Sequence, residues 1–346
     1  MTMNNSRDPA CTVPHVLRRP VTEQLRRPDT RPDDMITMRQ AYESGAACLA
    51  GAGIEEARTD AWMLFEAAFG ISRTAYLACM DDPAPVPETE RFERMIQRRM
   101  KHVPAAYLTG RAYFYGYEFA VDERVLIPRQ DTETLVEEAL LFLKEYPDRE
   151  PTVLDLCCGS GCILLTILKE MPNACGVGTD LSPGALQVAS ENCRRLGLHG
   201  LPEQADPDEK QDAGGGRTRC RITQADLFDG DWFHCHPGTR FSLITCNPPY
   251  IPSDVIPGLM EEVRLHEPHM ALDGGEDGFL FYRRLTRLAP AWLKDGGMLL
   301  CEIGYDQGEA VRTLFLGGGF EEVRVIKDLA GRDRVVMGIR RKRYCE

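Results

Sequence analysis

The sequence has no excess of positive charge. Its 346 residues include 41 Lys and Arg against 53 Asp and Glu, which leaves a formal net charge of -12. Proteins that bind nucleic acid by neutralising its phosphates usually present a basic surface. The charge balance therefore favours a protein or a small molecule as the ligand, and we expect no nucleic-acid partner.

Long apolar stretches and secretion signals are also missing. No apolar run approaches the roughly 20 residues that a helix needs to cross a bilayer, and no signal peptide with a basic start and an apolar segment is present. The 13 cysteines are odd in number and lack the spacing of a disulfide framework. Several lie inside apolar runs, as buried thiols do in a reducing compartment. We therefore predict no membrane partner and a cytoplasmic location.

No metal-binding pattern stands out. Cys157, Cys158 and Cys162 lack C-x-x-C spacing and have no matching second pair. The triplet His234-Cys235-His236 would place neighbouring side chains on opposite faces of a strand. We therefore predict that the protein holds no metal.

The amino-terminal part is expected to be helical after an unstructured start. Residues 1–34 are rich in Arg, Pro, Asp and Thr without a hydrophobic period. They predict a disordered tail, or an extension that is not native to the protein. Residues 35–103 carry aromatic side chains at helical spacing, among them Trp62, Phe65 and Phe69. These residues predict a bundle of about four helices.

Residues 104–128 change to the period of a β-strand. Residues 119–121 and 125–127 alternate in hydrophobicity on either side of the turn-like stretch 122–124. We predict a hairpin with those two strands, which links the helical bundle to the rest of the chain.

Residues 129–346 alternate between strands and helices. We predict seven strands, at 152–156, 175–180, 221–224, 241–246, 298–303, 322–326 and 334–339. The predicted helices lie at 160–171, 183–196, 278–293 and 307–316. This alternation indicates a doubly wound, Rossmann-like α/β domain with a mainly parallel sheet, whose last two strands form an antiparallel hairpin. Residues 199–217 interrupt the pattern with prolines and three consecutive glycines, and predict a flexible insertion.

A glycine-containing turn follows the first strand of this domain. Asp155 leads through Leu156 into Cys157-Cys158-Gly159-Ser160-Gly161 and a helix. Such a turn lets a ligand approach the backbone and the helix N-terminus, because Gly159 and Gly161 have no Cβ. The G-x-G-x-x-G pattern of dinucleotide sites is absent. The turn instead suits the methionine end of S-adenosylmethionine, and Asp155 either meets its ammonium group or orients the turn backbone.

Two further acids end the next two strands. Asp180 lies about 20 residues beyond the glycine turn, where a carboxylate accepts both ribose hydroxyls of a nucleotide. The alternative is a helix-capping acid, but Ser182 suits that role better. Asp226 is placed to accept from the adenine amino group while Leu227 covers the ring, unless it is an ordinary turn residue. Acids at three successive strand ends are a stronger pattern than any one of them.

The fourth strand runs into Asn247-Pro248-Pro249-Tyr250, the most informative motif of the chain. An amide or aniline-type nitrogen is planar and a poor nucleophile, so an enzyme that methylates it must hold both N–H bonds and align the nitrogen. The Asn247 side chain and the Pro248 carbonyl offer two acceptors, and proline adds no competing donor. Tyr250 is suited to stack on the flat acceptor group. We predict Asn247, Pro248 and Tyr250 as catalytic and all four residues as substrate-binding; the alternative is a rigid Pro-Pro turn without function.

Together these motifs resemble the protein-(glutamine-N5) methyltransferases that modify peptide chain release factors. The resemblance covers about residues 37–340. It rests on PAAYLTG at 104–110, LIPRQDTE at 126–133, DLCCGSG at 155–161, NPPY at 247–250, EP, ALDGG and DG within 267–278, and DLAGRDR at 328–334.

The resemblance implies a class I methyltransferase fold, S-adenosyl-L-methionine as the cofactor, and a protein substrate. That substrate would be a class 1 release factor, methylated on the glutamine of its Gly-Gly-Gln motif, and residues 35–103 would help to dock it. Cofactor contacts carry over to Cys157, Cys158, Gly159, Ser160, Gly161, Asp180, Leu227 and Asn247, and substrate contacts to Asn247, Pro248, Pro249 and Tyr250.

The sequence departs from the family pattern at two positions. Cys157 stands where glycine is common, and we expect this to matter little because Gly159 and Gly161 make the turn permissive. Gln130 replaces a frequent proline and loosens that segment slightly.

Two rival functions fit parts of the pattern. Asn-Pro-Pro-Tyr also serves nucleic-acid methyltransferases that act on adenine N6 or another exocyclic amine of a flipped base. The acidic charge and the helical amino-terminal part count against that alternative. The other rival is a module that binds S-adenosylmethionine without catalysis.

Overall fold

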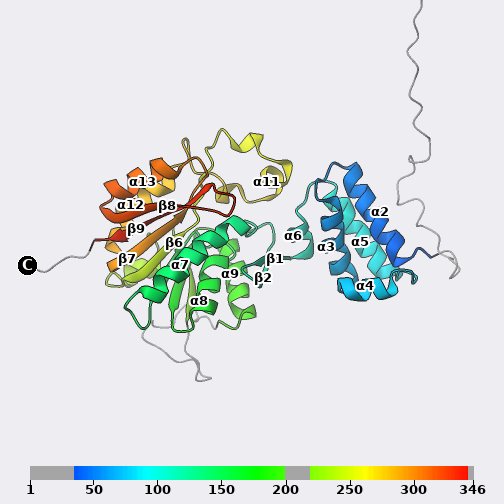
Figure 1. Cartoon of the computed structure of the whole chain (residues 1–346), viewed down its shortest axis with the longest axis horizontal. Helices are drawn as coiled ribbons and strands as arrows, with labels where there is room; N and C mark the ends of the chain where they lie inside the picture. The colour runs from blue at the N-terminus through cyan, green and yellow to red at the C-terminus, as the bar shows by residue number, and fades with distance from the viewer. Residues whose placement is uncertain (1–34, 199–218, 342–346) are drawn as a thin grey trace, which may run out of the picture.

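The computed structural model describes residues 35–198 and 219–341 (Figure 1). The predicted tail at 1–34 and the predicted insertion at 199–217 lie outside these residues. Among the helices of the described ranges, none combines the length and the apolar character needed to cross a membrane.

The first part of the described chain is helical. Its helices are α2 (Met38–Gly51), α3 (Ala57–Phe69), α4 (Arg73–Cys79), α5 (Val86–Arg99) and the short α6 (Ala105–Thr109). A capping box between Thr37 and Gln40 starts α2, because each residue's side chain accepts from the other's backbone N–H. The predicted aromatic stripe forms the core, where Phe65 stacks on Phe69 with ring centroids 4.2 Å apart. The helical bundle that the periodicity predicted is therefore confirmed.

The predicted hairpin exists, but its strands and its turn are different. The paired strands are β1 (Arg111–Phe114) and β2 (Tyr117–Ala120). They are joined by Tyr115 and Gly116, which both have positive φ, at 51° and 78°. Two-residue hairpin loops favour positive φ at both central residues because it matches the twist of the strands.

The sequence prediction placed this turn at 122–124 and a strand at 125–127, which is wrong. Residues 122–125 do form a turn, in which the Val125 N–H donates to the Asp122 carbonyl over 3.1 Å. Val125 and Ile127 then pack beside Val188 of α9 (Pro183–Arg195) instead of pairing in a sheet. Their alternation reflects burial against a helix, which hydrophobicity alone does not separate from burial in a strand.

The second part is a seven-stranded sheet with the order β5-β4-β3-β6-β7-β9-β8. Its strands are β3 (Thr152–Leu156), β4 (Cys175–Asp180), β5 (Cys220–Gln224), β6 (Phe241–Cys246), β7 (Leu293–Glu302), β8 (Phe320–Lys327) and β9 (Asp333–Arg340). The first five in the sequence pair in parallel. This confirms the predicted doubly wound, mainly parallel fold. The last two strands form the predicted antiparallel pair, and β9 inserts between β7 and β8.

Helices cover both faces of the sheet (Figure 1). One core cluster includes side chains of α7 (Glu133–Glu145), α8 (Cys162–Glu170) and α9, and the other includes side chains of α10 (Asp231–Cys235), α12 (Leu280–Leu288) and α13 (Gly308–Gly317). Helix α7 was not predicted from the sequence, although its buried residues follow helical spacing.

The helix predicted at 278–293 is too long. The chain leaves α12 after Leu288, and β7 already begins at Leu293, where it pairs with Phe241. A Cβ at Gly297 would lie 3.0 Å from the Ser242 carbonyl oxygen, so only glycine allows this close approach of two strands. The early start of β7 thus depends on a contact between strands and not on local propensity.

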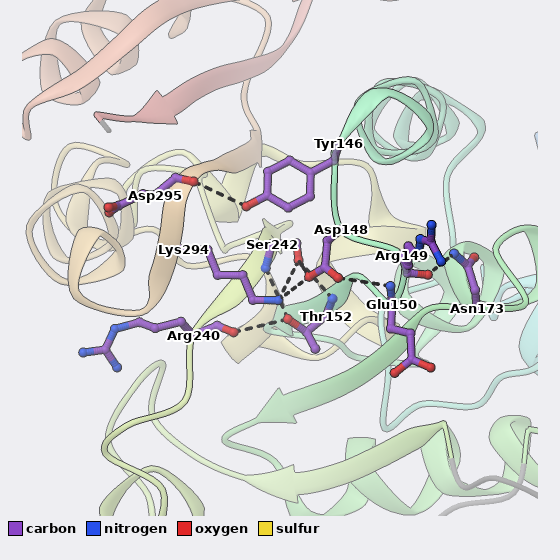
Figure 2. Close-up of polar contacts among 10 residues, drawn as sticks. All are labelled: Tyr146, Asp148, Arg149, Glu150, Thr152, Asn173, Arg240, Ser242, Lys294 and Asp295. Carbon is purple, nitrogen blue, oxygen red and sulfur yellow. Dashed lines mark hydrogen bonds and ion pairs between the residues drawn. The ribbon is translucent and has the colours of Figure 1, made fainter. Parts of the chain in front are cut away.

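A polar cluster joins the amino ends of three strands (Figure 2). The Lys294 ammonium group donates to an Asp148 carboxylate oxygen over 2.6 Å and to the Ser242 hydroxyl over 3.2 Å. The same hydroxyl accepts from the Thr152 backbone N–H over 3.1 Å. The cluster joins the first residues of β3, β6 and β7. It lies at the edge of the sheet opposite the carboxyl ends of the parallel strands.

We predict that Gly45→Ala destabilises the protein by about 1–3 kcal/mol in urea unfolding. A Cβ at Gly45 in α2 would lie 2.5 Å from Phe92 Cζ. Phe92 is buried and packs edge-on against Phe65, so its ring has no room to withdraw.

Gly51→Ala is the matched control at the end of the same helix. Nothing lies within 4 Å of a Cβ there, so alanine should stabilise the protein by about 0.5–1 kcal/mol through helix propensity. Equal effects of the two substitutions would contradict the proposed tight contact between α2 and α5.

Candidate functional site

A cavity of about 240 Å³ lies at the carboxyl ends of β3, β4, β5 and β6. Ligands of doubly wound sheets bind at this edge, where the chain crosses from one side of the first strand to the other. Nine residues predicted from sequence line it: Cys157, Cys158, Gly159, Ser160, Asp180, Asp226, Leu227, Asn247 and Pro249. Four other predicted residues do not: Asp155, Gly161, Pro248 and Tyr250.

The turn after β3 has positive φ at three residues, and not only at its two glycines. Cys157 has φ of 56°, in the left-handed region that side chains with a Cβ rarely adopt, and Gly159 and Gly161 also have positive φ. The expectation that the cysteine at position 157 matters little is therefore wrong. The cysteine occupies a strained conformation that glycine adopts without cost.

Asp155 lies beneath this turn and not in the cavity. Its side chain is fully buried, and one carboxylate oxygen accepts from the Thr245 hydroxyl of the neighbouring strand β6 over 2.8 Å. Burial raises the pKa of Asp155 to about 7, against the lowering effect of the Thr245 hydrogen bond. The carboxyl group thus joins the ends of β3 and β6 under the site.

Asp180 ties the end of β4 to the glycine turn. One of its carboxylate oxygens accepts from the Gly159 N–H over 2.9 Å, and the other accepts from the Ser182 N–H over 2.9 Å. The Ser182 side chain accepts from the Ala185 N–H and caps α9, as the sequence predicted. The Leu181 N–H contributes a further backbone hydrogen bond to this carboxylate, and the side chain lines the cavity.

Asp226 and Leu227 follow β5 on the far side of the cavity. Leu227 is buried and has φ of 56°, a second strained residue at the cavity wall. Asp226 forms an ion pair with Arg284 of α12 over 2.9 Å. Backbone strain of this kind persists where the surrounding structure enforces it, often beside a ligand.

The tetrapeptide 247–250 leaves β6 at the cavity mouth. Asn247 is partly exposed there, while Pro248 and Pro249 are buried. The Tyr250 carbonyl accepts from the Gln307 side chain over 3.0 Å. The backbone at Tyr250 also packs closely against the backbone at Gly274, since a Cβ at Gly274 would lie 2.7 Å from Tyr250 Cα. The loop is therefore held in place by Gln307, at the start of α13, and by Gly274, in the segment that precedes α12.

Several cavity residues were missed by the sequence analysis. They share no motif of polar side chains and come from two connecting segments and from α12: Arg124, Val125, Leu126, Ile127, Pro128, Arg129, Thr132, Pro268, Met270, Ala271, Phe281 and Arg284. The available signal was the family resemblance at 126–133 and 267–278, which marked these segments without assigning them a role.

Ion pairs hold the connecting segments against the helical bundle. Buried Arg99 of α5 lies 2.7 Å from Asp60 of α3 and 2.7 Å from Glu262 of α11 (Glu261–His266). Arg129 pairs with the buried Glu267. Arg129 lines the cavity and so does Pro268, the residue after Glu267, so this second pair joins two segments of the cavity wall.

We predict that Cys157→Gly stabilises the protein by about 1 kcal/mol, because it removes a side chain from the left-handed region. Urea unfolding measures the change. The matched control is Cys158→Gly, a buried neighbour whose φ is not positive. That substitution should destabilise the protein by about 1–2 kcal/mol. Destabilisation by both would show that the φ of Cys157 carries no strain.

Comparisons with known proteins agree with this arrangement. The family model for the PrmC N-terminal domain matches residues 40–110, and a model for a methyltransferase domain matches residues 153–216. The release factor glutamine methyltransferase of Caulobacter vibrioides is 38% identical over 88% of this chain and 97% of its own length. That of Cereibacter sphaeroides is 42% identical over 86% and 96%.

Among solved structures, a protein-(glutamine-N5) methyltransferase from Alicyclobacillus acidocaldarius is 30% identical. It covers 64% of this chain and 99% of its own, with a TM-score of 0.36. The two sequence relatives match most of this chain and nearly all of their own length. The chain therefore belongs to the release factor glutamine methyltransferase family.

Proposed function

We propose that this enzyme transfers a methyl group from S-adenosyl-L-methionine to the side-chain amide N5 of glutamine in the Gly-Gly-Gln motif of class 1 release factors. The observation that carries the proposal is the position of Asn247 and Pro249, which line the same cavity as the glycine turn and Asp180. The motif that would hold the acceptor amide and the turn and carboxylate that would hold the nucleoside therefore belong to one site.

The residues of the cavity fit S-adenosylmethionine. A Cβ at Gly159 would meet no atom within 4 Å, so the glycine leaves open space beside the cavity. Asp180 would accept from the ribose hydroxyls and Asp226 from the adenine amino group, with Leu227 against the ring. When bound, the cofactor supplies a methyl group that its sulfonium activates for transfer.

The chain's own residues prepare the acceptor amide. The Asn247 side-chain oxygen would accept one amide N–H and the Pro248 carbonyl the other, which fixes the nitrogen for in-line attack. Pro248 and Tyr250 lie just outside the cavity lining, beside Asn247 and Pro249, and from there Tyr250 would cover the flat face of the amide. These donor-poor contacts would hold the nitrogen while it gains the methyl group, and its proton leaves to solvent after the transfer.

The helical bundle would dock the release factor. It contacts α11 through the Arg99–Glu262 ion pair, and the residues that follow α11 line the cavity, so a protein held on the bundle would lie near that segment. The net charge of -12 disfavours the rival nucleic-acid substrate.

Methyl transfer is tested with labelled S-adenosylmethionine and purified release factor, DNA or RNA in separate reactions. We expect label only in the release factor, on the glutamine of Gly-Gly-Gln by peptide mass analysis. Label only in nucleic acid would overturn the proposal in favour of an exocyclic-amine methyltransferase. No label in any acceptor would favour a binding module.

Asn247→Ala should lower kcat/KM by at least about 30-fold, equivalent to about 2 kcal/mol of lost transition-state stabilisation. The matched control is Asn173→Ala, whose exposed side chain donates to the Arg149 carbonyl at the opposite edge of the sheet (Figure 2). That control should keep wild-type turnover. Wild-type turnover by the Asn247 variant would contradict its assigned role.

A further inference from the structure

Glu302 is a buried carboxyl group beside the tetrapeptide that the sequence analysis did not single out. It is the last residue of β7 and is 2% exposed. Cys301 pairs with Cys246 of β6 in the parallel ladder. Glu302 and Asn247 are therefore the next residues at two adjacent strand ends. Against the raising effect of burial, the Asn247 side chain lowers the pKa of the Glu302 carboxyl group as a hydrogen-bond donor does, and Glu302 Oε2 is buried without a hydrogen-bond partner among the described residues.

This carboxyl group has no ion pair to account for its burial. The adjacent guanidinium of Arg334 forms its ion pairs with Asp131, over 2.9 Å, and with Asp328, over 3.2 Å. None of the ion pairs among the described residues includes Glu302. A buried carboxylate without a paired cation destabilises a fold, and an apolar residue would pack there at lower cost. Its presence beside Asn247 points to a role in the site.

The two ends of an asparagine amide have nearly the same shape but opposite hydrogen-bonding roles. A carboxylate only accepts hydrogen bonds, so it selects the orientation in which the Asn247 NH₂ group faces Glu302. The Asn247 oxygen is then turned away from Glu302. In that orientation the oxygen is available to accept from the acceptor amide, as the proposed chemistry requires.

We propose that Glu302 is a positioning residue, which accepts from the Asn247 NH₂ group and thereby directs the Asn247 oxygen to the substrate amide. The inference rests on the proposed function, because it assigns a role in the same methyl transfer. Glu302 acts only through Asn247 and does not line the cavity.

The role has a pH signature. Burial raises the pKa of Glu302 to about 7, while Thr132, the Arg334 charge and Asn247 lower it and the Asp131 charge raises it. Burial raises the pKa of Tyr250, Tyr282 and Cys162, and the nearby Glu302 charge raises each of them further. Above that pKa the carboxylate accepts only. Below it the protonated acid also donates, and it then tolerates the reversed Asn247 amide. Methyl transfer should therefore slow as the pH falls through this ionisation.

The experiment compares wild type, Glu302→Gln, Asn247→Ala and the double variant in methyl transfer to purified release factor from pH 6 to 9. Glutamine has the shape of glutamate but satisfies both orientations of Asn247. We expect Glu302→Gln to lower kcat about 10-fold at pH 8. In this variant kcat should no longer fall as the pH is lowered from 8 to 6. The KM for S-adenosylmethionine should stay within about 2-fold of wild type. Glu321→Gln, on the exposed edge strand β8, is the matched control and should keep the wild-type profile.

The double variant separates positioning from a structural role. If Glu302 acts only through Asn247, adding Glu302→Gln to Asn247→Ala should lower kcat by less than about 2-fold further. A further 10-fold loss would overturn the proposal, since Glu302 would then act independently of Asn247. Unchanged kcat and an unchanged acidic decline in Glu302→Gln would overturn it too. Failure of the wild type to methylate the release factor would instead remove the proposed function on which the inference rests.

Discussion

The crossover of the chain from β5 to β6 is the constraint on which the site depends. The strands β4 and β5 lie on one side of β3, and β6 lies on the other. The loops that follow β3 and β6 therefore diverge above the sheet and leave a cavity between them. The hydrogen bond from the Thr245 hydroxyl to the Asp155 carboxylate joins β6 and β3 near the point where these two loops diverge. Without that crossover, the glycine turn and the tetrapeptide would not face the same space.

The cavity wall contains two residues with strained backbone. Cys157 and Leu227 both adopt positive φ and both line the cavity. The hydrogen bond from the Gly159 N–H to Asp180 holds the turn in place from β4. The surrounding core thus enforces backbone conformations that the local sequence does not favour, and this rigidity keeps the polar groups of the site aimed at one position.

Charge, and not apolar packing alone, connects the helical bundle to the methyltransferase domain. Arg99 is buried and pairs with Asp60 of the bundle and with Glu262 of α11, which precedes cavity-lining residues within 268–271. Removing one partner of a buried pair leaves an uncompensated charge, so such contacts specify one arrangement strongly. The tetrapeptide is instead held by a neutral hydrogen bond, in which the Gln307 side chain donates to the Tyr250 carbonyl.

The amino-acid sequence by itself determined the fold class, the bounds of β3, β4 and β6, and the motifs at 155–161 and 247–250. These features depend on local patterns: apolar runs of strand length, glycine after a strand, and proline where no donor is wanted. Only the tertiary structure decided that the hairpin turns at Tyr115-Gly116 and that β9 enters between β7 and β8. It also decided that Cys157 takes positive φ and that Glu302 lies beside Asn247. Strand pairing and side-chain contacts join residues far apart in the chain, and local periodicity carries no information about which distant partner a residue meets.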